Sequence, residues 1–192
     1  MVGPRSDPEF FDAKFRADPD PWRFDTRWYE RRKRALLMAL LPHERYRLAL
    51  EPGCANGHLT AALAQRCDRV IATDIAPRAV ELTTRRCATM PAVEVHRWGL
   101  GQPWRWPGDL DLLFLSEVAY YLTADELTRT ATDLASRLAV GGTIVLAHWR
   151  HPEPDHQLTG DHAHDLVLAA LAHRPRAHYD DADLRVDVLE TV

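Results

Sequence analysis

The feature that most constrains the fold is a strand–turn–helix–strand pattern between residues 48 and 74. Apolar residues from Leu48 to Leu50 predict a buried strand, and the turn after them carries Gly53 and Gly57. A segment with helical spacing follows, and a second apolar strand ends at Asp74. Glycines let a backbone approach a ligand closely, and an acid at the tip of the second strand can bind a ribose diol. The pattern therefore predicts a site for a nucleotide-type cofactor.

Glu51, at the end of the first strand, narrows the choice of cofactor. The dinucleotide fingerprint G-x-G-x-x-G brings a pyrophosphate to a helix N-terminus. This turn lacks the third glycine, and the acid before it would repel a pyrophosphate. An acid favours a ligand that bears a cation, such as the sulfonium or ammonium group of S-adenosylmethionine. A nicotinamide-dependent reductase and a non-catalytic cofactor-binding module remain as alternatives.

Composition limits the class of protein and its partners. A chain of 192 residues is long enough for a sizeable core, so we expect a single domain over 1–192 in which residues 1–45 form an arm and a helix that cover the cofactor site. The net charge of −4 argues against a nucleic-acid partner. The chain contains no apolar run of transmembrane length and no signal-peptide core, and its three cysteines lack metal-site spacing. We therefore expect a cytoplasmic protein without a membrane partner or a metal, and the oligomeric state stays open.

Strands alternate with helices along the rest of the chain, which predicts a doubly wound, Rossmann-like α/β fold. The expected helices cover residues 28–41, 58–66, 76–87, 123–140 and 158–172. The expected strands cover residues 47–51, 69–73, 93–97, 112–115, 143–147, 176–179 and 184–189. Thr123 and Glu126 form a capping-box pattern at the start of the fourth helix. Ligands in such sheets bind beyond the carboxyl ends of the strands, so we expect the site there.

The glycine turn resembles motif I of class I methyltransferases, E/D-x-G-x-x-x-G in its relaxed form. Further segments resemble one subfamily, the NodS-like methyltransferases: Asp20–Phe24, Tyr29–Arg32, Leu50–Gly57 and Ser116–Leu122. The namesake of that family N-methylates the free amine of a chitooligosaccharide during nodulation-factor synthesis. The resemblance runs from about residue 18 to the end of the chain. It implies a seven-stranded, mostly parallel methyltransferase sheet with an antiparallel last strand.

The resemblance also assigns cofactor contacts to four groups of residues. The methionine part and the ribose would be held by Glu51, Gly53, Ala55, Gly57 and Asp74. The adenine would lie near Ile75, Trp98, Gly99 and Leu100, although the family's adenine-binding acid is missing there. The sulfonium would lie beside Ser116, Glu117 and Val118. Residues of the N-terminal segment that could close over the cofactor are Trp22, Tyr29 and Arg31.

Methyl transfer is an in-line displacement that requires alignment of the groups and exclusion of water. An amine acceptor must present a free lone pair, so a histidine base helps near neutral pH. The candidate bases His148 and His162 follow the fifth strand; surface histidines and a metal site are alternative interpretations. We expect Tyr120, Tyr121 and Trp149 in the acceptor pocket, although the two tyrosines are equally compatible with a core position.

Taken together, the sequence predicts an S-adenosylmethionine-dependent methyltransferase of small-molecule biosynthesis. N-methylation of an amine, on an amino sugar or a specialised metabolite, is the leading hypothesis. O-methylation of a small hydroxylated acceptor is the alternative.

Overall fold

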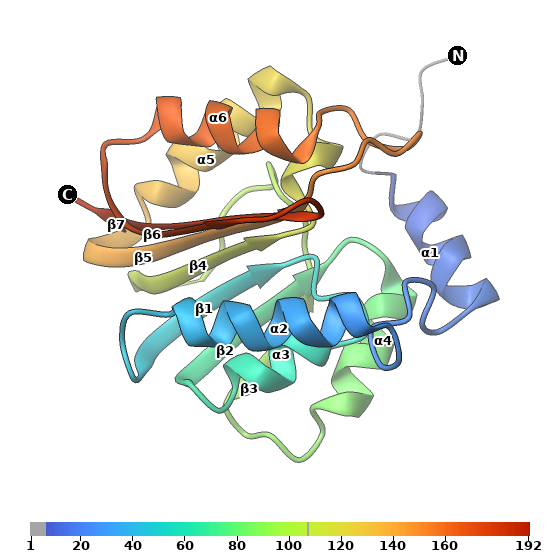
Figure 1. Cartoon of the computed structure of the whole chain (residues 1–192). Coiled ribbons are helices and arrows are strands. Elements are labelled where there is room, and N and C mark those ends of the chain that lie inside the picture. The colour runs from blue at the N-terminus through green and yellow to red at the C-terminus, as the bar shows by residue number, and fades with distance from the viewer. Residues whose placement is uncertain (1–6, 107) are drawn as a thin grey trace. The chain divides into compact units, whose positions relative to one another are not determined.

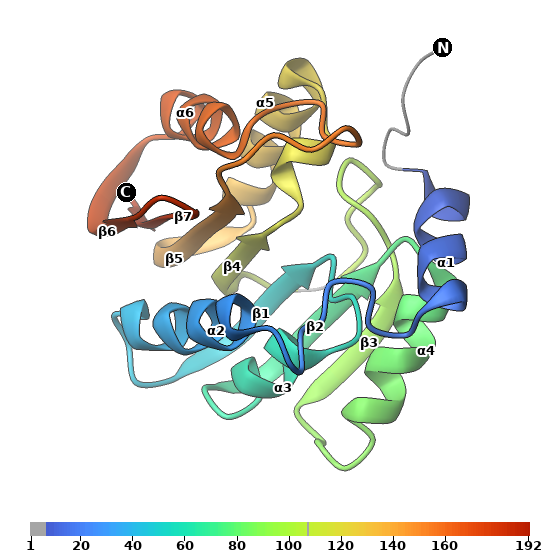
Figure 2. The same ribbon diagram turned by 45° about the vertical axis from the view of Figure 1, so that its right-hand side comes forward.

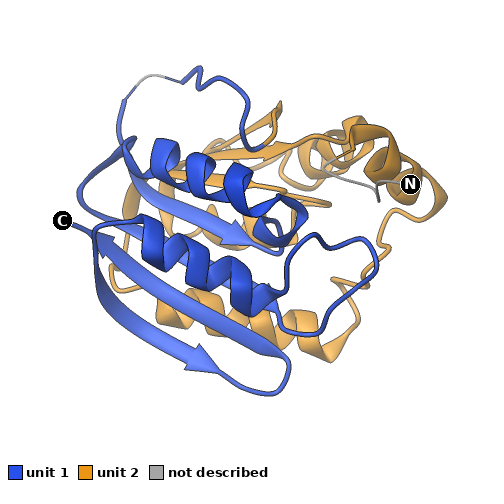
Figure 3. Ribbon diagram, turned by 90° about the horizontal axis from the view of Figure 1, so that it is seen from above, with its two compact units in different colours: residues 1–6, 100–192 blue, residues 7–99 orange. Residues whose placement is uncertain are grey.

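The computed structural model describes residues 7–106 and 108–192. The strands belong to one seven-stranded sheet, as the family resemblance implies. In their order across the sheet they are β3 (Val93–Arg97), β2 (Cys67–Asp74), β1 (Tyr46–Pro52), β4 (Leu110–Ser116), β5 (Leu138–Trp149), β7 (Leu184–Thr191) and β6 (His173–Asp180). The chain divides into two compact units, an N-terminal unit of residues 7–99 and a C-terminal unit that begins at residue 100 (Figure 3). The expected single domain over 1–192 stays a prediction, and the first six residues of the expected arm lie outside the described residues.

The N-terminal unit consists of parallel strands with helices beside them (Figure 1). Its elements are α1 (Pro8–Ala17), α2 (Trp28–Leu40), β1 (Tyr46–Pro52), α3 (His58–Leu63), β2 (Cys67–Asp74), α4 (Pro77–Arg86) and β3 (Val93–Arg97). Strand β2 pairs in parallel with both β1 and β3. Glu51 lies beside Ala72, and Asp74 lies beside Arg97. The carboxyl ends of these strands therefore meet at one edge, where we expect the cofactor.

The segment expected to be an arm contains helix α1. Pro8 occupies the first turn of α1, where its missing N–H costs no hydrogen bond. Phe11 and Phe15 of this helix are buried, at 8% and 2% exposure. Asp12 Oδ1 accepts a 2.7 Å hydrogen bond from the backbone N–H of Arg78, so α1 is fixed to the start of α4 (Figure 2). The sequence concealed this helix because prolines are more often signs of a turn.

In its described residues, the C-terminal unit contains the other strands, two α-helices and one short 3-10 helix. Its elements are β4 (Leu110–Ser116), the short 3-10 helix η1 (Ala119–Tyr121), α5 (Ala124–Ala135), β5 (Leu138–Trp149), α6 (Gly160–Ala170), β6 (His173–Asp180) and β7 (Leu184–Thr191). Strands β4 and β5 are parallel. Strand β7 lies between β5 and β6 and is antiparallel to both. This confirms the antiparallel last strand that the resemblance implies.

One predicted boundary in the C-terminal unit is wrong. The sequence predicts that the fourth helix continues to residue 140, just before Gly141 and Gly142, but α5 ends at Ala135, and β5 already begins at Leu138. Leu138 pairs with Leu110, and the register of the two strands shifts immediately after this pair. Gly141 has a φ of 78°, a conformation that suits glycine at such an irregularity. The glycines therefore let the strand bend instead of ending the helix.

The capping box at the start of α5 provides a test of the local sequence reading. Thr123 Oγ1 accepts from the N–H of Glu126, and the Glu126 carboxylate accepts from the N–H of Thr123. We expect Thr123→Ala to lower the free energy of unfolding by about 1 kcal/mol, because both bonds are affected. Thr128→Ala in the same helix is the matched control, and it should be neutral or slightly stabilising. Urea unfolding of both variants measures the difference, and equal effects would contradict the assignment.

Candidate functional site

Two buried carboxyl groups lie at the ends of neighbouring strands of the N-terminal unit. Glu51, near the end of β1, is 2% exposed, and Asp74, at the end of β2, is 7% exposed. Asp74 is held by two backbone donors: its Oδ1 accepts from Ala76 N–H at 2.9 Å and its Oδ2 from Ala55 N–H at 3.0 Å. Within the described part of the chain, the buried Oε2 of Glu51 has no hydrogen-bond partner. A ligand that donates hydrogen bonds would satisfy this oxygen.

Burial controls the ionisation of both acids. It raises the pKa of Glu51 to about 8, and the charge of Asp74 acts in the same direction. It raises the pKa of Asp74 to about 6, against the lowering effect of the backbone N–H groups that it accepts from. Negative charge that is expensive to bury is stabilised by a cation or by hydroxyl donors. The pair therefore fits a ligand that carries a positive charge and a diol, which are the features of S-adenosylmethionine.

The turn between β1 and α3 adopts left-handed backbone conformations. The φ angles are 75° at Gly53, 53° at Ala55 and 83° at Gly57. A side chain at Gly57 would be strained by this φ and would crowd Thr83, 3.1 Å from the position of a Cβ atom. The Thr83 hydroxyl donates to the carbonyl of Ala55 at 3.0 Å, which ties the turn to α4. Such fixed backbone strain is typical of ligand-binding turns.

Asn56 connects this turn to the segment after α1, a role that the sequence reasoning missed. Its Nδ2 donates to the Pro19 carbonyl at 3.2 Å and to Asp20 Oδ1 at 3.1 Å. The carbonyl of Asn56 accepts from Arg86 Nε at 2.7 Å. Asn56 is buried, which a polar residue in a glycine turn does not reveal by its type alone. The N-terminal segment is therefore attached directly to the predicted cofactor turn.

The predicted residues of the N-terminal segment occupy different surroundings. Trp22 is half-buried and packs edge-on against Phe15, with ring centres 5.4 Å apart. Tyr29 is half-buried, and the Nζ atom of Lys33 lies 5.1 Å from the centre of its ring. Arg31 is exposed, and its Nη1 donates to the carbonyl of Thr26 at 2.9 Å. Their roles in closing over a cofactor stay predictions.

The segment predicted to lie near the adenine is tightly packed. A Cβ atom at Gly99 would overlap with Cγ2 of Ile75, so a larger residue fits only if Ile75 shifts. Trp98 is 3% exposed, and its backbone N–H donates to the Asp74 carbonyl at 3.1 Å. Trp98, Gly99 and Ile75 are thus packed around the end of β2. Leu100, the next residue, is half-buried and belongs to the C-terminal unit.

In the C-terminal unit, Glu117 is hydrogen-bonded to two other predicted site residues, Tyr120 and Trp149. Its φ of 57° is left-handed, which is rare for glutamate and marks a functional or strained position. Its Oε2 accepts from the Tyr120 hydroxyl at 2.8 Å and from the backbone N–H of Trp149 at 2.8 Å. Ser116 and Val118, on either side of it, are half-buried. The turn after β4 is therefore a fixed structure that presents a carboxylate.

Aromatic rings surround this turn. The ring of His156, which the sequence reasoning did not select, stacks on Tyr120 with centres 3.7 Å apart and lies edge-on to Tyr121. Burial raises the pKa of Tyr121 above its usual range, and the charges of Asp155 and Glu117 add to this effect. Aromatic faces beside carboxylates suit a cationic group on a sugar or ring. The signal that could have identified His156 is its place in the same loop region as the predicted histidines.

The structure separates the two candidate bases. His148 is completely buried; its Nε2 accepts from the backbone N–H of Ala119 at 3.1 Å, and its Nδ1 lies 3.0 Å from Nε2 of His164. Both ring nitrogens of His148 are therefore engaged in hydrogen bonds within the protein, which favours His162 over His148 as the candidate base. His162 is exposed on α6, where its backbone N–H donates to Thr159 Oγ1, and its role as a base stays a prediction.

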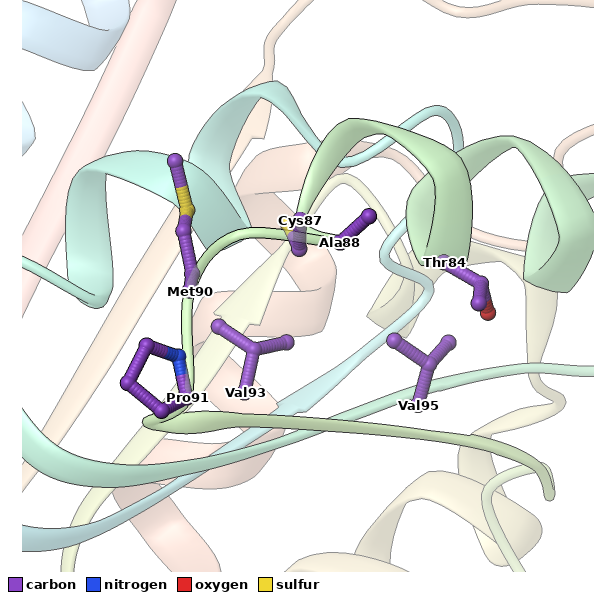
Figure 4. Close-up of a pocket in the computed structure, with 7 residues that line it drawn as sticks. All are labelled: Thr84, Cys87, Ala88, Met90, Pro91, Val93 and Val95. Carbon is purple, nitrogen blue, oxygen red and sulfur yellow. The ribbon is translucent and has the colours of Figure 1, made fainter.

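A surface hollow of about 300 Å³ lies elsewhere in the N-terminal unit. Its lining comes from the end of α4, the loop after it and β3 (Figure 4): Thr84, Cys87, Ala88, Met90, Pro91, Val93 and Val95. Val93 begins β3, so the hollow is at the opposite end of the strand from the edge with Asp74. It offers no charged side chain and does not resemble a cofactor site.

In residues 7–106 and 108–192, no group of three or more histidine, cysteine, aspartate or glutamate side chains is arranged to hold a metal ion. Over the same ranges, no helix has the length and apolar character needed to cross a membrane.

The strand order, the antiparallel last strand and the acidic glycine turn define the class I methyltransferase fold. The solved structure of N-methyltransferase NodS from Bradyrhizobium japonicum WM9, in complex with S-adenosyl-L-homocysteine, shares this fold. Its TM-score is 0.84 at 23% identity, and the match covers 98% of this chain and 99% of that chain. The family described as Nodulation protein S (NodS) matches residues 9–153, and the chain belongs to this family.

Two curated relatives extend the comparison. Nodulation protein S of Rhizobium tropici is 33% identical over 138 residues, which are 70% of this chain and 57% of the relative. The dTDP-4-amino-2,3,4,6-tetradeoxy-D-glucose N,N-dimethyltransferase of Saccharopolyspora spinosa is 28% identical over 131 residues, which are 65% of this chain and 51% of that protein. The matched region thus spans between half and two thirds of the length of these relatives.

The contact between Gly99 and Ile75 gives a prediction for the segment that is expected to lie near the adenine. We expect Gly99→Ala to lower the free energy of unfolding by about 1–3 kcal/mol, because the added methyl group overlaps with Ile75. In the background of Ile75→Ala, the same change should cost clearly less, since the space is then open. A double-mutant cycle by urea unfolding measures this coupling. Additive effects of the two substitutions would contradict the steric explanation.

Proposed function

We propose that the protein transfers a methyl group from S-adenosylmethionine to the amine of a small molecule, with amino sugars as the acceptor class. The observation that carries the proposal is the pair of buried carboxyl groups, Glu51 and Asp74, at the ends of neighbouring parallel strands. Membership of the Nodulation protein S family supports it. The two relatives whose names state an N-methylation support an amine as the methyl acceptor.

The residues of the N-terminal unit would hold the cofactor. Asp74, fixed by two backbone N–H groups, retains lone pairs for the hydroxyls of a ribose. The buried Oε2 of Glu51 would accept from a cationic donor of the methionine part. Gly53 and Gly57 allow the backbone to approach the ligand. When bound, S-adenosylmethionine supplies an electrophilic methyl group on a sulfonium.

The residues of the C-terminal unit would receive the acceptor. The Glu117 carboxylate is held in one orientation by Tyr120 and by the Trp149 backbone. Its charge would attract an ammonium group, and the half-buried ring of His156, which stacks on the buried Tyr120, would pack against the sugar. The amine must lose its proton before it can act as a nucleophile. We assign recognition of the ammonium to Glu117 and leave His162 as the candidate base.

Cofactor binding and methyl transfer are tested by calorimetry followed by an assay. We expect S-adenosylhomocysteine to bind, and Asp74→Ala to weaken binding at least about tenfold, because its charge-assisted hydrogen bonds to the ribose are lost. Asp68→Ala, at the exposed start of the same strand, is the matched control and should bind like the wild type. No measurable binding by the wild type would overturn the proposal.

The acceptor class is tested with labelled S-adenosylmethionine and three probes. The probes are a chitooligosaccharide with one free amine, its fully N-acetylated counterpart and a dTDP-linked 4-amino sugar. Mass spectrometry should find the label on nitrogen in the probes with a free amine and none in the acetylated one. Labelling of the acetylated probe would indicate O-methylation and contradict an amine acceptor.

A further inference from the structure

Three buried polar side chains form a hydrogen-bonded network in the C-terminal unit, called the polar network below. It joins His148 at the end of β5, His164 in α6 and Asp187 in β7, of which the two histidines are fully buried and Asp187 is 6% exposed. Nδ1 of His148 lies 3.0 Å from Nε2 of His164, and Nδ1 of His164 lies 2.6 Å from Oδ2 of Asp187. At the other end, Nε2 of His148 accepts the backbone N–H of Ala119.

The backbone N–H of Ala119, at the end of the polar network, determines the position of every proton in the network. Ala119 N–H can only donate, so Nε2 of His148 must carry no proton, and its Nδ1 must carry one. Nδ1 of His148 then donates to His164, whose Nε2 must also be unprotonated. His164 in turn donates from Nδ1 to Asp187. Both imidazoles are therefore neutral and are held in one tautomer.

The surroundings of Asp187 keep it an acceptor. Its Oδ1 lies 2.7 Å from Nδ1 of His178, and its Oδ2 accepts from Nε of Arg185 at 3.0 Å. Burial alone would raise the pKa of Asp187, but the hydrogen bonds from His164 and His178 and the charge of Arg185 hold it below its usual range. Burial lowers the pKa of His164, which agrees with a neutral ring. The carboxylate thus fixes the direction of the hydrogen bonds.

The start of α6 lies close enough to β5 for His164 to join the polar network. Gly160 is the first residue of α6, and a Cβ atom there would overlap with the backbone carbonyl of Trp149. The helix therefore begins directly against the end of β5. His164 follows four residues later on the same face of the helix, and this places its ring beside that of His148. The absence of a side chain at residue 160 thus allows the contact between the two histidines.

The polar network ends at the turn that contains the predicted acceptor residues. Ala119 begins η1, between Glu117 and Tyr120, which are joined by a hydrogen bond. The ring of Tyr120 also lies edge-on to that of His148, with centres 5.1 Å apart. We propose that His148, His164 and Asp187 are positioning residues that hold η1, and through it Glu117 and Tyr120, in the geometry that receives the methyl acceptor. This inference rests on the proposed function.

Energetics favour this role over simple packing. Removing polar and charged groups from water is costly, and apolar side chains of similar size often stabilise a core as well or better. A fully connected polar network has the different advantage that it admits one arrangement of its members. A turn with a left-handed glutamate at residue 117 needs such restraint, because its backbone would otherwise relax.

The kinetic test uses two substitutions at one position. His164→Phe keeps an aromatic ring and removes the acceptor for Nδ1 of His148, whereas His164→Gln retains a carbonyl oxygen that can accept from it. With the free-amine chitooligosaccharide, we expect His164→Phe to lower kcat/KM at least about tenfold, because small displacements of a binding turn are costly. His164→Gln should recover most of the loss. The Kd for S-adenosylhomocysteine should stay within about twofold of wild type in both.

Val167→Ala is the structural control, because Val167 is buried on the same helix as His164 but is not part of the polar network. It should lower the Tm and leave kcat/KM within about twofold of the wild type. The proposal is overturned if His164→Phe has no kinetic effect, or if Val167→Ala loses as much activity at an equal loss of Tm. Failure of His164→Gln to recover activity would also count against it.

Nuclear magnetic resonance of the wild type keeps the inference testable without turnover or a folded variant. With ¹⁵N-labelled histidine, we expect both His148 and His164 to be neutral and protonated at Nδ1 from about pH 6.5 to 8.5, with slow hydrogen exchange at the Ala119 amide. A proton on Nε2 of His148, or rapid exchange at Ala119, overturns the inference. If the wild type methylates no probe but shows these signals, the proposed acceptor class is contradicted, and the positioning role of the polar network is still supported.

Discussion

The structure of the candidate site depends on the burial of two acids at the ends of adjacent strands. Glu51 and Asp74 are in the register that parallel pairing of β1 and β2 produces, and both are almost without solvent contact. Burying carboxyl groups opposes folding unless they are protonated or find donors. Asp74 has two backbone donors, and an oxygen of Glu51 has none within the described residues. The fold therefore maintains an unfavourable arrangement that a cationic, donor-rich cofactor would relieve. This is how binding sites commonly exchange stability for function.

The C-terminal unit solves the opposite problem, because its buried polar groups satisfy each other. The polar network of Asp187, His164 and His148 ends at the backbone N–H of Ala119, and every proton position in the network follows from that donor. Such a network stabilises one conformation of the turn that contains Glu117. The two units thus divide the proposed chemistry: one has an unsatisfied acid for the cofactor, and the other has a rigid carboxylate for an amine.

Sequence patterns predicted most of the fold, because apolar strands and capped helices are local signals. The alternation of strands and helices predicted a doubly wound, parallel sheet, and the family resemblance implied its antiparallel last strand, whereas the strand order comes from the structure. The errors have physical causes: Pro8 begins a helix instead of preventing one, and Gly141 lies in a strand irregularity. Residue type suggested that His148 faces an acceptor, but its burial depends on contacts with α6 and β7 that lie far away in sequence. Asn56 and His156 were missed for the same reason.

The central claim is that the buried carboxyl group of Glu51 binds the cationic part of the cofactor. It is tested most directly by the number of protons released when the cofactor binds. With a pKa of about 8, Glu51 is mostly protonated near pH 7, and a ligand that donates to its carboxylate must expel that proton. Calorimetric titration with S-adenosylmethionine in two buffers of different ionisation enthalpy counts the protons released. Comparison with Glu51→Gln cancels the ionisation of the ligand itself. The account predicts that the wild type releases up to about one proton more than the variant and that this excess vanishes above about pH 9. Equal proton release by the two proteins near pH 7 would contradict it.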